Sequence, residues 1–246
     1  MRRADRDGHG RNSHFGDGRG RGGGDRCGEA LPQYEGFFAE FYDILHSSYD
    51  ADLNIYLDLA KQHGDPALEL GCGTGRLLIP LAAAGHAVTG LDLSRDMLTK
   101  CQEKLDIEGE ATAKRVSLVQ GDIRRFELGR KFNLIIAACN TILHCTAVQD
   151  LLAVFARARE HLAPGGVFAV DLSIPNVKAM VECSGEEEVF EVIHPVRGSR
   201  IVDTYRAAFD FVRQIETIDT RLEEWDGRVL LRSARARSER GIYFPR

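Results

Sequence analysis

A glycine-rich turn in the chain has the composition of a binding site for a nucleotide-like ligand. The turn is Glu69–Arg76 (ELGCGTGR), and it contains Gly71, Gly73 and Gly75. Glycines let the backbone approach a ligand closely, and a helix that begins after the turn offers unpaired N–H groups. Dinucleotide-binding turns carry a third glycine where this chain has Arg76, so the turn favours a ligand other than a pyrophosphate.

Two acidic residues follow at the ends of later predicted strands. Asp92 lies in the strand predicted over 86–93, where a carboxylate can accept hydrogen bonds from ribose hydroxyls. Asp122 follows the strand predicted over 115–120 and could accept a hydrogen bond from an adenine amino group. One glycine-rich turn is weak evidence for a nucleotide-binding site. Three turns with site residues, each after a predicted strand and in this order, are specific in combination. A doubly wound domain with another nucleotide ligand is the alternative.

The loop Cys139–Cys145 (CNTILHC) holds the candidate catalytic residues. Ligands of doubly wound folds sit at the carboxyl ends of the strands, which predicts that Asn140, Thr141 and His144 lie near the reacting groups. His144 is the candidate base, because imidazole titrates near neutral pH, and a structural histidine bonded to backbone is its alternative. Asn140 could orient either the cofactor or the acceptor.

The elements that would position these residues alternate between strand and helix patterns. Strands are predicted over 67–70, 86–93, 115–120, 132–137 and 166–174, with helices between them that include 94–105 and 147–163. This alternation indicates an α/β fold with a doubly wound, Rossmann-like parallel sheet. The last of these strands is almost continuously apolar, which is typical of a strand buried on both faces.

The rest of the chain divides into three further segments. Residues 31–64 predict an N-terminal helical cap, residues 65–185 the ligand-binding domain, and residues 186–246 an antiparallel lid with a turn at Asp226–Gly227. Residues 1–30 are rich in arginine and glycine and cannot bury enough apolar surface to fold, which favours a disordered leader. An RNA-contacting arm is the alternative, although interleaved aromatic residues are missing.

The successive motifs resemble those of class I S-adenosylmethionine (SAM)-dependent methyltransferases. They are Glu69–Gly75, Asp92–Met97, Gly121–Ile123 and Leu162–Gly166. The resemblance implies that the glycines face the methionine part of SAM, Asp92 holds the ribose, and Asp122 contacts the adenine amine with Ile123 and Met97 nearby. Met97 could equally be a core residue. The expected cofactor-binding residues are Glu69, Gly71, Cys72, Gly73, Gly75, Asp92, Leu93, Met97, Asp122, Ile123 and Cys139.

The acceptor loop and the lid are similar to those of glycine N-methyltransferase-like and amino-sugar N-methyltransferase-like enzymes. This resemblance implies methyl transfer to a small-molecule amine or hydroxyl, with Tyr34, Tyr42 and Tyr49 closing the other side of the site. A catalytically inactive SAM-binding module and an RNA methyltransferase are the alternatives. The last two strands of the family's usual seven are not evident, which predicts a fragment, or a homo-oligomer formed through an uncovered sheet edge.

Composition narrows the function classes further. The formal net charge of −5 argues against nucleic acid and anionic membrane as general partners. The sequence contains no apolar run of membrane-spanning length and no secretory signal pattern. Six scattered cysteines without a Cys-x-x-Cys pair predict no metal site and a reducing, cytoplasmic location.

Overall fold

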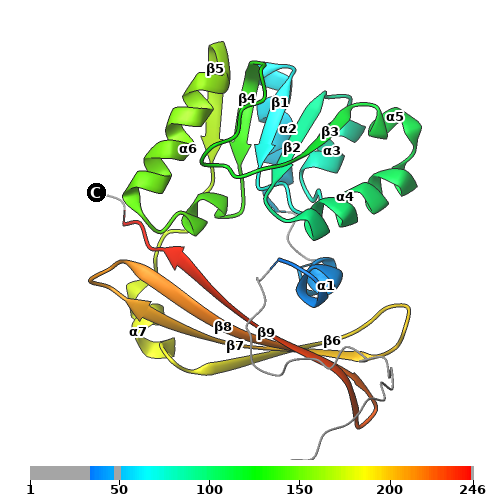
Figure 1. The fold of residues 1–246 in the computed structure, drawn as a ribbon, viewed down its shortest axis with the longest axis vertical. Helices are drawn as coiled ribbons and strands as arrows, with labels where there is room; N and C mark the ends of the chain where they lie inside the picture. Colours follow the sequence, from blue (N-terminus) through cyan, green and yellow to red (C-terminus); the bar gives the residue numbers. More distant parts are fainter. Residues whose placement is uncertain (1–33, 47–50, 245–246) are drawn as a thin grey trace, which may run out of the picture.

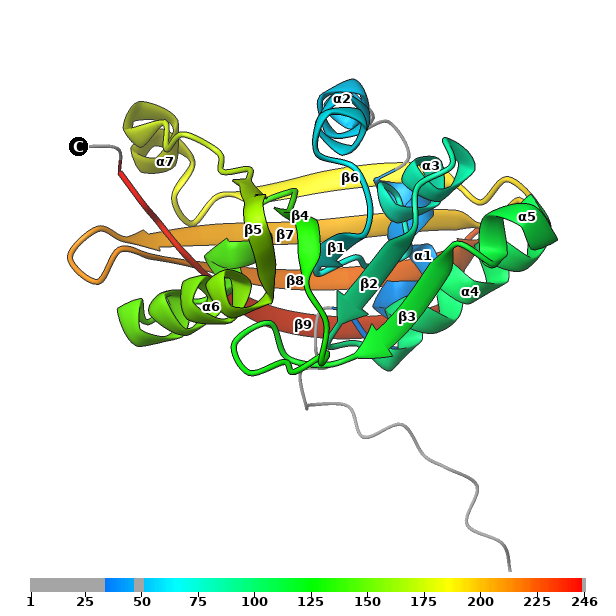
Figure 2. The same cartoon turned by 90° about the horizontal axis from the view of Figure 1, so that it is seen from above.

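A parallel sheet and an antiparallel sheet form two layers in the computed structural model, with helix α1 (Phe37–Leu45) between them (Figure 1). The structure describes residues 34–46 and 51–244, so the prediction for residues 1–30 lies outside the described residues. The strand orders are β3-β2-β1-β4-β5 and β6-β7-β8-β9. Strands of the antiparallel sheet run across those of the parallel sheet (Figure 2). This architecture confirms the predicted fold class.

The parallel sheet supplies the edge on which the predicted site residues lie. Its strands are β1 (Ala67–Leu70), β2 (Val88–Asp92), β3 (Val116–Gln120), β4 (Phe132–Ala137) and β5 (Leu162–Val170). Its helices are α2 (Leu53–His63), α3 (Leu78–Ala83), α4 (Arg95–Glu108), α5 (Glu110–Ala113) and α6 (Val148–His161), and the 3₁₀ helix η1 (Thr141–His144) follows β4. All neighbouring strands are parallel, so their carboxyl ends meet at one edge.

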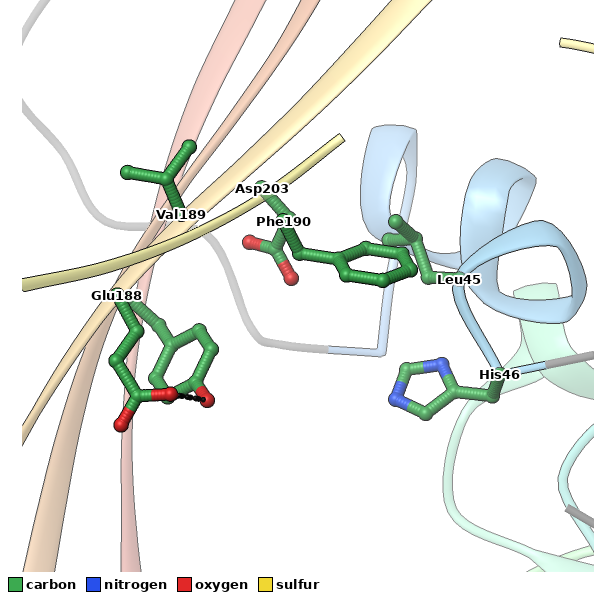
Figure 3. A pocket seen from close by; sticks show the side chains of 7 residues that line it. Leu45, His46, Glu188, Val189, Phe190 and Asp203 are labelled. Carbon is green, nitrogen blue, oxygen red and sulfur yellow. Dashed lines mark hydrogen bonds between the residues drawn. The ribbon is translucent and has the colours of Figure 1, made fainter. Parts of the chain in front are cut away.

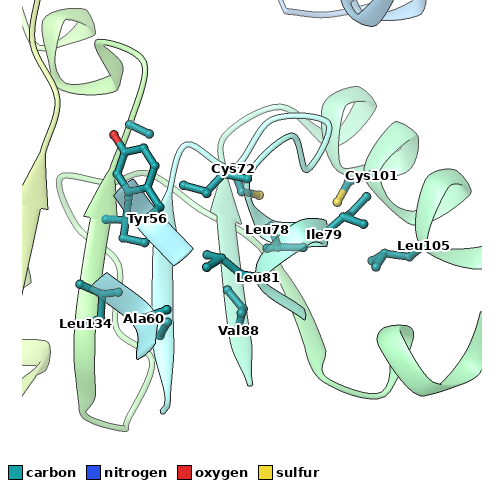
Figure 4. Packing of buried hydrophobic residues seen from close by; sticks show 14 of the residues in the cluster. Tyr56, Ala60, Cys72, Leu78, Ile79, Leu81, Val88, Cys101, Leu105 and Leu134 are labelled. Carbon is teal, nitrogen blue, oxygen red and sulfur yellow. The ribbon is translucent and has the colours of Figure 1, made fainter. Parts of the chain in front are cut away.

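Two apolar clusters cover the two faces of the parallel sheet. On one face, residues of α2, α3 and α4 pack against β1, β2 and β4, with Leu78, Leu81 and Leu134 fully buried (Figure 4). On the other face, Val154 and Ala158 of α6 pack against alternate residues of the same strands. Burying one such leucine contributes roughly 1.5–3 kcal/mol, so the two clusters hold the helices against the sheet.

The antiparallel sheet forms the second layer. Its strands are β6 (Glu187–Ile193), β7 (Arg200–Asp210), β8 (Ile215–Asp226) and β9 (Val229–Gly241), and the short helix α7 (Val177–Cys183) lies beside β7. The turn predicted at Asp226–Gly227 joins β8 to β9, and Gly227 has a φ of 54° there. Phe38 and Phe41 of α1 are buried against Ile201 and Leu222 of the sheet.

Ion pairs reinforce this contact between α1 and the antiparallel sheet. Glu40 of α1 pairs with Arg197 and Arg232, and both arginines also pair with Glu224. The Glu224 side chain is only 2% exposed and also accepts a hydrogen bond of 2.7 Å from Ser199 Oγ. Helix α1 therefore belongs to the lid layer as much as to the parallel layer.

Several sequence-based boundaries differ from the structure. The N-terminal helices do not form one cap, because α1 packs on the antiparallel sheet while α2 packs on the parallel sheet. The fifth strand spans Leu162–Val170 rather than 166–174, and it is only half-buried because it is an edge strand. The helices α5 and α7 were not predicted. Among the described residues, no helix is long and apolar enough to cross a membrane.

Candidate functional site

The glycine-rich turn follows β1 directly and depends on its glycines. Gly71, Gly73 and Gly75 have φ values of 70°, 54° and 85°, which residues with a side chain rarely adopt. A Cβ on Gly71 would lie 2.6 Å from Cγ2 of Thr141, and one on Gly75 would lie 2.6 Å from Sγ of Cys101. The first and third glycines are therefore required by close packing beneath the turn.

Asp92 at the end of β2 fixes the turn from the neighbouring strand. Its Oδ2 accepts a hydrogen bond of 2.8 Å from the Gly73 N–H, and its Oδ1 accepts one of 2.8 Å from the Ser94 N–H. Ser94 caps α4 by accepting from the Met97 N–H at 3.2 Å. Burial raises the pKa of Asp92, whereas the backbone N–H groups of Ser94, Gly73 and Leu93 act in the opposite direction. Each carboxylate oxygen of Asp92 can accept a further hydrogen bond from a ligand.

Asp122 after β3 is engaged by arginine side chains. Arg124 donates to both carboxylate oxygens, with distances of 2.8–3.1 Å, and Arg124 also pairs with Asp150 at 2.9 Å. The hydrogen bonds from Arg124 lower the pKa of Asp122 to about 2. A ligand amine at this position would share the carboxylate with Arg124, a residue that the sequence analysis did not single out.

A cavity of about 320 Å³ joins these elements at the carboxyl ends of the parallel strands. Tyr34 and Tyr42 form its α1 side, and the loop after β4 forms the opposite side. The lining residues are Tyr34, Tyr42, Gly71, Gly73, Asp92, Leu93, Met97, Asp122, Ile123, Arg124, Cys139, Thr141, His144 and Cys145. The cavity therefore brings together the two predicted acids, the glycine turn and the acceptor loop.

His144 and Tyr34 meet across the acceptor end of this cavity. The Tyr34 hydroxyl lies 3.2 Å from His144 Nε2, and the two rings contact edge to face with centroids 5.5 Å apart. Burial within the cavity lowers the pKa of His144 to about 4, and the charge of Arg240 on β9 acts in the same direction. The imidazole is therefore neutral at pH 7 although its edge faces the open cavity.

The segment that carries Tyr34 is tied to the start of α4. Ser94 Oγ donates a hydrogen bond of 2.5 Å to the Tyr34 carbonyl oxygen, and the Gly36 N–H donates one of 2.6 Å to Asp96 Oδ2. Asp43 of α1 accepts from Thr74 Oγ1 at 2.5 Å and pairs with Lys104 at 2.9 Å. These contacts hold the α1 wall against the glycine turn.

The acceptor loop is anchored from two sides. The Tyr243 hydroxyl, just after β9, donates a hydrogen bond of 2.6 Å to the Cys145 carbonyl oxygen. The Asn140 side chain donates to Ser173 Oγ at 2.8 Å and accepts from the Ser173 N–H at 2.6 Å. Asn140 has a φ of 62°, so its bonds to Ser173 stabilise a left-handed turn just before η1.

A buried acid lies beneath the glycine turn. Glu69 is 4% exposed, and burial raises its pKa to about 8, which makes it largely protonated at neutral pH. No described residue bonds to its Oε2. Arg76 lies nearby and donates to both oxygens of Asp52, at 2.6 and 2.9 Å, and to the Cys139 Sγ at 2.8 Å.

The comparison with protein families covers the segment that builds most of this cavity. Residues 67–166 match the family model described as "Methyltransferase domain". This segment is a methyltransferase domain. The resemblance that the motifs predicted is thereby confirmed for the region from β1 to the middle of β5.

Individual relatives match the methyltransferase domain over different lengths. The dTDP-3-amino-3,4,6-trideoxy-alpha-D-glucopyranose N,N-dimethyltransferase of Streptomyces venezuelae is 34% identical over 145 residues, which cover 56% of this chain and 58% of the relative. The cypemycin N-terminal methyltransferase of a Streptomyces species is 28% identical over 189 residues, which cover 75% of this chain and 73% of the relative. The match to the first relative thus spans little more than half of that protein's length.

A solved structure supports the fold beyond the methyltransferase domain. The crystal structure of Streptomyces venezuelae DesVI matches with a TM-score of 0.68 and 23% sequence identity, over 86% of this chain and 86% of that chain. Because this coverage extends well past residue 166, the two-layer fold with its antiparallel sheet is shared.

The methyltransferase domain places most predicted site residues on the cavity wall, but not all of them. Nine line it: Gly71, Gly73, Asp92, Leu93, Met97, Asp122, Ile123, Cys139 and His144. Glu69 and the Cys72 side chain are buried in the core beneath the turn, and Gly75 packs on α3 and α4. Asn140 is bonded to Ser173 instead of lining the cavity.

Sequence reasoning missed the pairings that cross between distant segments. The contact between Tyr34 and His144 joins residues 110 positions apart, and no local pattern signals it. The Arg124 pair with Asp122 had a local signal, because a basic residue two positions after an acid in a turn can fold back on it. Arg240 approaches His144 from β9, which only the packing of the second layer brings close.

Proposed function

We propose that this chain binds SAM in the cavity at the strand ends and transfers its methyl group to an amine of a small-molecule acceptor. The observation that carries the proposal is the Asp92 carboxylate, fixed by the Gly73 and Ser94 N–H groups beside a cavity that also holds the Tyr34–His144 pair. The domain family and the naming of several relatives as N,N-dimethyltransferases support the reaction class.

The residues present fit SAM. The open backbone at Gly73 admits close approach of the methionine part, and the free lone pairs of Asp92 suit two ribose hydroxyls. Leu93, Met97 and Ile123 offer apolar surface for the adenine, and Asp122 can accept from its amine. When bound, SAM supplies a methyl group already activated by the sulfonium.

The chain's own residues then align the acceptor and exclude water. Nε2–H of a neutral His144 donates to the Tyr34 hydroxyl, which holds the imidazole in place and leaves Nδ1 to accept a hydrogen bond from the acceptor amine. This bond aims the nitrogen lone pair at the methyl group, which is the main requirement of an in-line displacement. With a pKa of about 4, His144 orients the amine and takes up its proton only transiently, before water receives it.

Two measurements test the proposal. Isothermal titration with SAM should give saturable one-site binding, and a radiolabelled methyl-transfer assay should label an amine pool that includes amino sugars. Binding without transfer to amines, phenols or RNA would support an inactive SAM-binding module instead. Labelling of RNA alone would favour an RNA methyltransferase, although the net charge of −5 argues for a small acceptor. Absence of SAM binding overturns the proposal.

The oligomeric part of the proposal concerns β5. This strand is at the edge of the parallel sheet and pairs only with β4 among the described strands. Apolar side chains nearby are exposed, including Leu152 at 62%, Phe155 at 43% and Ile174 at 80%. Such an edge favours pairing with a second copy, which would cover both the backbone groups and this apolar surface. Light scattering tests it, and a monodisperse monomer at high concentration would contradict it.

A further inference from the structure

A second cavity lies outside the methyltransferase domain, between the end of α1 and strands β6 and β7 (Figure 3). Its volume is about 260 Å³, which suits a small organic molecule. Phe190 points from β6 toward Leu45, and His46 closes the side nearest α1 (Figure 3). The lining residues are Leu45, His46, Glu188, Val189, Phe190, Asp203 and Tyr205.

The lining combines aromatic or imidazole rings with two carboxylates. Glu188 and Tyr205 are cross-strand neighbours, and the Tyr205 hydroxyl donates a hydrogen bond of 2.5 Å to Glu188 Oε2. Phe190 and Asp203 are the neighbouring cross-strand pair on the same face. Carboxylates beside aromatic faces are the arrangement that attracts organic ammonium ions, through charge and through the ring quadrupole.

Asp203 is the residue that most clearly lacks a partner. Its Oδ1 is buried, and no described residue forms a hydrogen bond with it. Burial raises the pKa of Asp203, and the neighbouring His46 side chain acts in the opposite direction. A buried acceptor without a donor costs stability, so a donor or cation brought into the cavity would recover that cost.

We propose that this cavity is a binding site for a small organic ammonium ion with an apolar body. The ammonium group lies between the Asp203 and Glu188 carboxylates, and its methyl or methylene groups contact Phe190 and Tyr205. The apolar body packs on Leu45 at the α1 side of the cavity. A methylated ammonium suits the site, because its positive charge is attracted to both carboxylates while its methyl groups contact the ring faces.

The ammonium site is separate from the methyl-transfer site but adjacent to it. The His46 ring stacks on Tyr42 with centroids 4.4 Å apart, and its Nδ1 lies 2.9 Å from the Tyr42 carbonyl oxygen. Tyr42 lines the proposed SAM cavity, so this stacked pair forms the wall between the two. Binding of an ammonium ion here requires neither SAM nor methyl transfer.

Choline and its neutral isostere 3,3-dimethyl-1-butanol are the probes. Titrated into the full chain and followed by isothermal calorimetry or ligand-observed NMR, choline should bind, and the isostere should bind about tenfold more weakly or not at all. Asp203→Asn keeps the shape of the side chain and should weaken choline binding about tenfold or more. Phe190→Leu should weaken it by a smaller factor, because it removes the ring but not the charges.

Asp219→Asn is the matched control. Asp219 lies on β8 with its side chain on the opposite face from Asp203, and it pairs with the exposed Arg237. The Asp219→Asn variant should bind choline with the affinity of the unmodified chain. The unmodified chain saturated with S-adenosylhomocysteine should also bind choline with unchanged affinity. Equal binding of both probes, or unchanged choline binding in Asp203→Asn, would overturn the proposal. Choline displaced by S-adenosylhomocysteine would assign the binding to the other cavity and overturn it as well.

Discussion

Replacing Glu69 by glutamine tests the electrostatics beneath the glycine turn. The Glu69 carboxyl has a pKa of about 8 in the folded chain and an ordinary value of 4.5, so folding retains a proton that the unfolded chain loses. The stabilising contribution of that proton is fully present below pH 4.5 and is lost as the pH rises through 8. At pH 7 the accumulated loss is about 3 kcal/mol.

Glutamine is neutral at every pH and keeps the oxygen that accepts the backbone hydrogen bond from Leu78. Glu69→Gln should therefore remove a slope of about 1.4 kcal/mol per pH unit between pH 5.5 and 7.5. Its absolute gain at pH 7 is smaller than 3 kcal/mol, because an unpaired buried amide costs about 1–3 kcal/mol.

Urea unfolding at pH 5.5, 6.5 and 7.5, without ligand, measures this slope directly. Glu108→Gln is the control, since Glu108 is exposed at the end of α4 and should leave the slope of the unmodified chain unchanged. The same slope in Glu69→Gln and in the unmodified chain would refute the reasoning, because it would mean that Glu69 is ionised when folded.

Three further perturbations test the site and the contact between the layers. Asp92→Asn presents an amide to two backbone N–H groups, and calorimetry should show SAM affinity about 30- to 150-fold lower, with Asp106→Asn unchanged. The His144 ring protons should titrate near pH 4 by NMR, and a midpoint near 6.5 would contradict burial of the ring. Glu224→Gln should lower the free energy of unfolding by about 1–3 kcal/mol in urea, discounted because its arginine partners are partly exposed, and no loss would mean that the buried Glu224 carboxylate does not stabilise this contact.

The sequence predicted the parallel layer well because its signals are local. Apolar runs of strand length, the glycines after Leu70 and the acid at Asp92 depend only on neighbouring residues, and the structure has β1 and β2 within two residues of the predicted limits. The same holds for the turn at Gly227, where a positive φ requires glycine. Local chemistry therefore predicted most of the wall that faces the proposed cofactor.

The remainder depends on contacts between segments that are far apart in the chain. The amphipathic pattern of α1 predicted a helix but not that Phe41 would pack on Ile201 of the antiparallel sheet. The apolar pattern of β5 is typical of a strand buried on both faces, but β5 is a half-buried edge strand, as the predicted uncovered edge requires. Likewise the lowered pKa of His144 arises mainly from burial and in smaller part from Arg240 on β9, and no pattern around position 144 contains that information.

The position of α1 has a consequence for the kinetics of the proposed methyl transfer. The segment from Tyr34 to Gly36 is hydrogen-bonded to Ser94 and Asp96, directly beside the cavity that it lines. A molecule held beneath this segment can leave on that side only after both bonds break and α1 shifts against the antiparallel sheet. We therefore expect escape of the spent cofactor, rather than bond making, to limit the steady-state rate. A first-turnover burst followed by a slower, viscosity-dependent phase would be the signature of such a gate.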